Sequence, residues 1–168
     1  MLTPKSSTRV KGRISAQDFH AEHRDDVFAP TPLATSLKIN LNLMQPRKLE
    51  GRIGDFTGAF LNALVDEEVI VRPPQVVRYS KPTLWRLLKA LYGLRKAPAL
   101  WHKCLAELLA KLSVIQLESD SSLYVGKDLA VFVHVDDLLA VGPGARIEWL
   151  FEEIQKLAEK YLKEGGRK

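Results

Sequence analysis

Two adjacent carboxylates, Asp136 and Asp137, interrupt an apolar stretch near the C-terminal end of the sequence. The residues on either side, 129–133 and 138–141, are predicted to be two buried strands, so the acids fall in the turn between them. Two carboxylates at the tip of an apolar hairpin repel each other unless a divalent cation neutralises them. Asp is also a common residue in ordinary polar turns, so the dipeptide alone leaves both interpretations open.

A third acid, Asp55, is predicted at the end of a short strand over 51–56, just before one or two helical turns at 57–64. If this strand is a neighbour of the Asp136–Asp137 hairpin, the three carboxylates converge. Three carboxylates and a triphosphate suit two Mg²⁺ ions, which would activate a 3′-hydroxyl and hold the leaving pyrophosphate. An Asp before a helix is also a common structural cap, and this alternative stays open.

The charge of the chain is unevenly distributed. The net charge is +5 over 168 residues, yet the stretch 72–103 carries eight Lys or Arg and no acid, whereas 118–137 carries five acids against Lys127. A basic face beside an acidic metal site is what phosphodiester chemistry needs. The alternative is a solvated basic surface with its aromatic residues in the core, and for Trp85 and Trp101 we favour the core interpretation.

Several protein classes are disfavoured by composition. Apolar residues make up 46% of the chain, which is typical of a folded protein. We expect no membrane association, because no apolar run is long enough to span a bilayer and the N-terminus lacks the apolar core of a signal peptide. The single Cys104 excludes an internal disulfide and a cysteine metal cluster, so an intracellular, reducing setting is expected.

The first third of the sequence is predicted to form one exposed strand over 10–19 and one short helix over 35–44, capped by Thr35 or Ser36. Lys11 and Arg13 lie on one side of that strand, because they are two residues apart. They are candidates for holding a phosphate group, or they are simply the charges of an edge strand.

Two longer helices are predicted, one beginning at Ala97–Pro98 and one over 145–162, because apolar residues recur there at helical spacing. Each should pack one apolar face under the sheet, and Cys104 then lies in the core. Strands and helices in this order predict an α+β fold in which an antiparallel sheet is backed by helices.

Five blocks of this sequence resemble, in order, the motifs of reverse transcriptases from copia-type (Pseudoviridae) LTR retrotransposons. The resemblance covers about residues 9–163. The blocks are 28–32 (Phe-Ala-Pro-Thr-Pro), 55–62 (Asp-Phe-Thr-Gly-Ala-Phe-Leu-Asn), 88–101 (Leu-Lys-Ala-Leu-Tyr-Gly-Leu-Arg-Lys-Ala-Pro-Ala-Leu-Trp), 119–124 (Ser-Asp-Ser-Ser-Leu-Tyr) and 133–139 (Val-His-Val-Asp-Asp-Leu-Leu).

The resemblance implies a fingers–palm polymerase fold within a single reverse transcriptase domain over 1–168. About 9–50 would be fingers-like and about 51–163 palm-like, with the chain truncated before the thumb and RNase H. The implied function is RNA-directed DNA polymerase, with two Mg²⁺ ions, or Mn²⁺ in their place. The implied partners are an RNA or DNA template with its primer and dNTPs. The implied setting is a larger polyprotein in cytoplasmic particles, with the nucleus as an alternative.

The resemblance also implies roles for individual residues. Asp55, Asp136 and Asp137 would be the catalytic carboxylates that bind the metal ions. His134 stands where the family has Tyr beside the Asp pair.

On the substrate side, the resemblance gives Arg13 a contact to the incoming triphosphate, with Lys11 as a second cation. Phe60 would block a 2′-hydroxyl, although a core position is the alternative from the residues alone. Gly93 and Lys96 would lie under the template–primer and nucleotide, with Lys96 in place of the family's Gln.

The sequence leaves two alternative functions open. One is a catalytically inactive, truncated retrotransposon remnant with at most nucleic-acid binding. The other is an unrelated Mg²⁺-dependent phosphodiesterase, which the ordered blocks disfavour.

Overall fold

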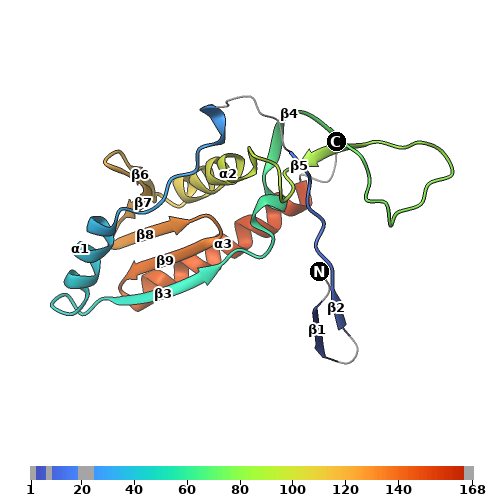
Figure 1. Ribbon diagram of the computed structural model, residues 1–168. Coiled ribbons are helices and arrows are strands. Elements are labelled where there is room, and N and C mark those ends of the chain that lie inside the picture. The colour runs from blue at the N-terminus through green and yellow to red at the C-terminus, as the bar shows by residue number, and fades with distance from the viewer. Residues whose placement is uncertain (1–2, 7–8, 19–24, 165–168) are drawn as a thin grey trace.

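A computed structural model describes residues 3–6, 9–18 and 25–164 of the chain (Figure 1). In these ranges the protein combines helices with antiparallel sheets, in agreement with the α+β class predicted from the sequence. Within the described ranges, none of the helices has both the length and the apolar character of a membrane span.

The largest sheet has five strands in the order β3-β9-β8-β7-β6, and every neighbouring pair is antiparallel (Figure 1). The first of these strands comes from far earlier in the sequence than the other four and forms one edge. The strands are β3 (Glu50–Asp55), β6 (Ile115–Leu117), β7 (Asp120–Gly126), β8 (Leu129–His134) and β9 (Asp137–Gly142).

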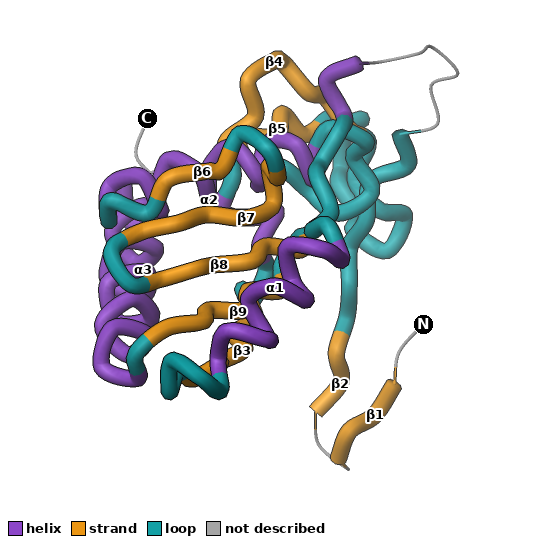
Figure 2. Tube along the Cα trace, turned by 90° about the vertical axis from the view of Figure 1, so that its left-hand side faces the viewer, coloured by secondary structure: helices purple, strands orange, loops and turns teal. Residues whose placement is uncertain are grey.

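Two long helices, α2 (Ala97–Lys111) and α3 (Gly144–Glu164), cover one face of this sheet, and α1 (Ala34–Met44) lies on the other (Figure 2). Two glycines of β3, Gly51 and Gly54, face opposite sides of the sheet. A Cβ at Gly51 would touch the Met44 side chain at the end of α1, whereas one at Gly54 would collide with the Phe151 ring of α3. This agrees with strand geometry, because residues three apart in a strand point to opposite faces.

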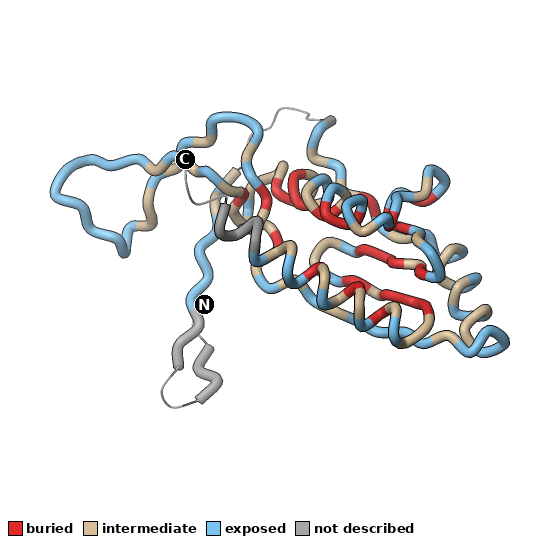
Figure 3. Tube along the Cα trace, turned by 180° about the vertical axis from the view of Figure 1, so that it is seen from behind, coloured by how far each residue is buried: buried red, intermediate tan, exposed pale blue. Residues whose placement is uncertain are grey.

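The core lies between the sheet and the helices α2 and α3 (Figure 3). Trp101, Leu105 and Leu109 of α2 are buried there with Val131 and Leu138 of the sheet. These apolar positions recur every three or four residues along α2, so one helix face enters the core, as predicted. Burial also raises the pKa of the Cys104 thiol, in keeping with the core position expected for it.

Smaller elements lie outside the main sheet. A two-stranded sheet pairs β4 (Leu64–Val71) with β5 (Trp85–Lys89), and the loop 72–84 between them extends well away from the body (Figure 1). The remaining elements are β1 (Thr3–Ser6), β2 (Arg9–Lys11), the 3₁₀ turn η1 (Asp25–Val27) and the 3₁₀ turn η2 (Ala59–Asn62).

The structure corrects two local predictions in the N-terminal third. The strand expected over 10–19 ends at Lys11, and residues 12–18 that follow are irregular, while Phe19 lies outside the described residues. The helix expected after Thr35 or Ser36 begins at Ala34 instead, with Leu33 as its N-cap residue. The Leu33 N–H donates to the buried Asp120 carboxylate of β7 at 3.2 Å, so a distant acid satisfies the helix start.

Candidate active site

Asp55 and Asp137 are brought together by the pairing of β3 with β9. Asp55 is the last residue of β3 and lies directly opposite Asp137, the first residue of β9. Since Gly54 faces α3, Asp55 projects from the other face, and paired residues in a sheet share a face. Both carboxylates are therefore on the face opposite α3, and both residues are exposed to solvent.

Asp136 lies beside this pair, in the turn between β8 and β9. We predicted that the turn would carry both acids, but it consists of Val135 and Asp136, while Asp137 already belongs to the strand. The Phe56 N–H donates to the Asp136 carbonyl at 3.0 Å, one residue beyond the Asp55–Asp137 pair. The backbone thus places all three predicted catalytic acids at one end of the sheet.

The chemistry of these donors fits Mg²⁺, which prefers oxygen ligands and commonly binds carboxylates that are open to solvent. However, among the described residues no group of three or more His, Cys, Asp or Glu side chains is close enough together to hold a metal ion. The backbone therefore gathers the acids, while their side chains are not closed around a common point.

His134 is the last residue of β8 and pairs in register with Asp137. Its side chain is exposed at the same end of the sheet as the three acids.

Arg13 and Phe60, two predicted substrate contacts, both lie against one aromatic ring, that of Tyr92. The Arg13 guanidinium lies 5.5 Å from the centre of the Tyr92 ring, and the Phe60 ring centre lies 4.9 Å from the same ring. Phe60 is half-buried and packs against the core. Its contacts are therefore those of the core residue that the sequence offered as the alternative to a nucleotide contact. The sequence analysis did not single out Tyr92 as the link between them.

Gly93 lies where the N-terminal segment crosses the start of α2. The Ala16 N–H and the Ser15 hydroxyl both donate to the Tyr92 carbonyl, at 2.7 and 3.1 Å. Gly93 has a φ of +89°, and a Cβ there would collide with the Ala16 carbonyl. Gly93 is therefore needed for the backbone crossing, whatever it contributes to ligand binding.

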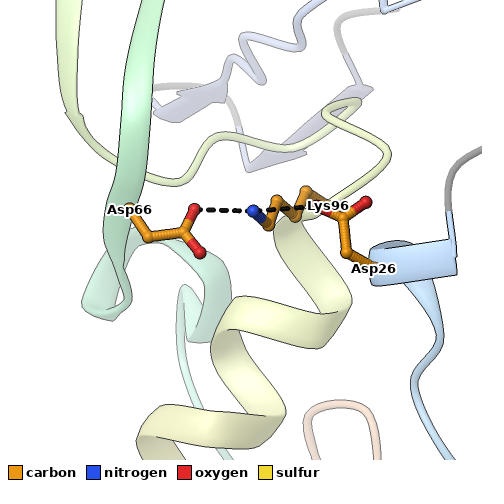
Figure 4. Close-up of polar contacts among 3 residues, drawn as sticks. All are labelled: Asp26, Asp66 and Lys96. Atoms are coloured by element: carbon orange, nitrogen blue, oxygen red, sulfur yellow. Dashed lines mark ion pairs between the residues drawn. The ribbon is translucent and has the colours of Figure 1, made fainter.

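Lys96 is held between two carboxylates. Its Nζ lies 2.9 Å from Asp26 of η1 and 2.9 Å from Asp66 of β4, as Figure 4 shows. The hydrogen bond to Asp26, and then that to Asp66, raise the pKa of Lys96 above its ordinary value. In this structure Lys96 therefore ties three segments together. The other predicted cation, Lys11, is in β2, and its side chain lies outside the described residues.

The basic stretch 72–103 is divided between two environments. Arg72, Arg78 and Lys81 are exposed on the extended loop, whereas the Arg95 side chain nearer the core is half-buried. The indole N–H of Trp85 donates to the Tyr79 hydroxyl at 2.8 Å, and Trp85 is only half-buried, so the predicted core position is not fully reached. The loop thus presents cations and an aromatic pair to solvent.

Trp101, also predicted to be a core residue, is buried, with 3% of its surface exposed. Its indole N–H donates to the Val135 carbonyl in the turn at 2.7 Å, and the Phe56 ring packs edge-on against it at 5.0 Å. Sequence reasoning placed Trp101 correctly but missed this contact with the turn that carries Asp136.

Comparison with known proteins shows which family this sequence matches. A family model described as "Reverse transcriptase (RNA-dependent DNA polymerase)" matches residues 3–163. The Retrovirus-related Pol polyprotein from transposon RE1 of Arabidopsis thaliana is 33% identical over 146 residues, which are 82% of this chain and 10% of that protein. The putative transposon Ty5-1 protein of Saccharomyces cerevisiae is 34% identical over 110 residues, which are 61% of this chain and 36% of that protein.

A Pol polyprotein from the tobacco (Nicotiana tabacum) transposon TNT 1-94 is 28% identical over 144 residues, which are 80% of this chain. The chain spans only about a tenth of the length of the Pol polyproteins that it matches.

Proposed function

Because the chain belongs to the reverse transcriptase family, as a copia-type retrotransposon member, we propose that it carries the RNA-directed DNA polymerase site of such an element. The reaction would transfer a nucleotide to a primer 3′-hydroxyl. The observation that carries the proposal is the register of β3 against β9, which sets Asp55 opposite Asp137 and next to Asp136.

In this proposal Asp55, Asp136 and Asp137 hold two Mg²⁺ ions, or Mn²⁺ in their place. When bound, the ions would activate the primer hydroxyl and neutralise the triphosphate. The protein itself would position the three carboxylates through its backbone, at an open face of the sheet. Both Asp55 and Asp137 are exposed there, so a primer end can approach them.

The incoming dNTP would lie on the side of the Arg13–Tyr92–Phe60 contact. Arg13 is exposed above the Tyr92 ring, where its guanidinium can meet phosphate oxygens. We propose that Phe60, which packs against the same ring, limits the space beside the sugar. Lys96 is already paired with two acids, so its contribution would be to fix the segment below the nucleotide. For Lys11 the proposal rests on the resemblance alone.

The same proposal extends to architecture and setting. Residues of about 9–50 would act as the fingers-like part and about 51–163 as the palm-like part. The matched relatives are Pol polyproteins, which supports an origin within a larger polyprotein. A template of RNA or DNA with its primer would be the partner, in cytoplasmic particles.

The second candidate is an inactive remnant that at most binds nucleic acid. It is favoured by one observation: the acidic side chains in the described part of the structure do not close into a group that could hold a metal. The two candidates differ in what happens at a primer end.

Primer extension separates the two. The chain is incubated with poly(rA)·oligo(dT), dTTP and Mg²⁺, alongside the variants Asp136→Asn and Asp128→Asn. Asp128 is an exposed acid in the turn between β7 and β8, at a φ of +60° that Asn also tolerates, so it is the matched control. We expect extension by the wild type and by Asp128→Asn, and none by Asp136→Asn. Template binding without extension by any of them would favour the inactive remnant.

A further inference from the structure

The turn that carries Asp136 has an unfavourable backbone conformation. Val135, the first of its two central residues, has a φ of +57°, while Asp136 is not among the residues with positive φ. A two-residue hairpin with positive φ at this position normally has Gly there. For a β-branched residue the conformation is a genuine outlier, which persists only where the surroundings hold it.

Two hydrogen bonds hold this turn from outside the hairpin. The Trp101 indole N–H donates to the Val135 carbonyl at 2.7 Å, and the Phe56 backbone N–H donates to the Asp136 carbonyl at 3.0 Å. Both carbonyls of the turn are therefore fixed in direction. One donor comes from α2 and the other from the residue that follows Asp55, so two separate elements hold the turn.

The two donors also support each other. The Phe56 ring packs edge-on against Trp101, with the ring centres 5.0 Å apart and the planes at 68°. Trp101 is almost fully buried, and Phe56 packs against the same core. The indole therefore cannot swing away without opening the core, and its N–H would lose its partner if the Val135 carbonyl turned.

We propose that Trp101 is a positioning residue for the carboxylates of the proposed site. Its indole N–H stabilises the strained conformation of Val135, and this conformation sets the direction in which the Asp136 and Asp137 side chains leave the backbone. The inference rests on the proposed function for its catalytic meaning, but its structural content can be measured without any polymerase activity.

The test is amide hydrogen exchange, followed by NMR, in the full chain and in its Trp101→Phe variant. Phe keeps a large ring in the core and removes only the N–H donor and part of the ring area. The Phe56 amide reports on the Asp136 carbonyl, and the Ala90 amide, which donates to the Ala63 carbonyl at 2.8 Å, reports on core stability elsewhere. We expect the protection of Phe56 to fall on the order of tenfold more than that of Ala90.

A purely structural role for Trp101 would lower the protection of both amides by the same factor, and that result would overturn the proposal. A rescue variant gives an independent check. Val135→Gly removes the strain, because Gly adopts positive φ at little cost. In the Trp101→Phe background, Val135→Gly should restore Phe56 protection to within about twofold of the wild type. A double variant as poorly protected as Trp101→Phe alone would also contradict the proposal.

Primer extension by the same variants connects this inference to function. If the wild type extends a primer, Trp101→Phe should extend it more slowly, and the added Val135→Gly should recover part of the rate. If the wild type does not extend a primer, the proposed function fails, while the exchange measurement still decides whether Trp101 holds the turn.

Discussion

Asp55 and Asp137 lie directly opposite each other at the last position of the β3–β9 ladder. Like charges on directly opposed residues destabilise a sheet pair. Asp136 adds a third negative charge in the adjoining turn. The sheet thus carries a local electrostatic cost, which a binding site for cations would explain.

Removing that repulsion should stabilise the protein in the absence of metal. Changing both Asp136 and Asp137 to Asn should raise the free energy of unfolding by about 0.5–1 kcal/mol, because the side chains keep their size and lose their charge. Urea denaturation in the presence of EDTA measures this difference. Asp128→Asn, in the turn at the opposite end of β8, should change stability little. A double variant less stable than the wild type would count against a shared site for these acids.

Gly93 should not tolerate a side chain. Gly93→Ala is expected to lower stability by about 1–3 kcal/mol, because Ala is strained at a φ of +89° and its Cβ would collide with the Ala16 carbonyl. Gly12→Ala is the matched control, since nothing lies within 4 Å of a Cβ at that position. Thermal unfolding of the two variants should show a lower Tm for Gly93→Ala alone. Equal Tm values would mean that the N-terminal segment does not cross there in solution.

Lys96 should stabilise the fold through its two ion pairs. Lys96→Met is expected to cost about 1 kcal/mol, a modest figure because Asp26 and Asp66 are partly exposed and are screened by solvent. The raised pKa of Lys96 means that this contribution is fully present below its ordinary pKa of 10.5 and is lost as the pH rises through the higher value in the folded state. It should therefore be constant across the neutral range.

Urea denaturation at low and high salt tests this, with Lys103→Met as a control for an exposed lysine of the same helix. The cost of Lys96→Met should shrink at 1 M salt, whereas that of Lys103→Met should stay near zero. A cost that does not depend on salt would show that packing of the lysine stem, and not charge, accounts for the effect.

The extended loop should bind nucleic-acid backbones. Arg78 and Lys81 are exposed there with no acid between 72 and 103, so they are available for phosphate contacts. Binding to poly(rA)·oligo(dT) should weaken steeply with salt, and changing both residues to Gln should reduce the slope of log K against log salt by about 2. Lys127→Gln, an exposed lysine in the turn between β7 and β8 and outside the basic stretch, serves as the control. An unchanged slope in the double variant would exclude these two contacts.

Much of the sheet and its helices could be predicted from the sequence. The strand ending in Asp55 and the helix from Ala97 were placed to within a residue, because their apolar patterns are long or are bounded by clear breaks. We expected the three acids to lie near each other if the strand ending in Asp55 neighboured the Asp136–Asp137 hairpin. In the structure β3 and β9 are indeed neighbours.

Other features could not be predicted, because they depend on contacts between distant parts of the chain. Val135 follows an apolar strand, and its side chain would suit a continuation of that strand. Nothing in the sequence therefore indicates its positive φ or the hydrogen bond between its carbonyl and Trp101. The partners of Lys96, Asp26 and Asp66, come from separate segments with no spacing rule that links them. The contact of Asp120 with the start of α1 could not be predicted either, because the two residues are far apart in the sequence.

The central claim is that Asp55 and the Asp136–Asp137 pair form one cation site, and Mn²⁺ binding tests it most directly. Mn²⁺ is titrated into the chain in the presence of dTTP, and free Mn²⁺ is followed by electron paramagnetic resonance. Binding to dTTP alone is subtracted from each curve. We predict protein-dependent binding that is weakened at least tenfold both by Asp55→Asn and by Asp137→Asn, and is unchanged in Asp128→Asn. Binding that survives Asp55→Asn unchanged would contradict the claim that the two strands supply one site.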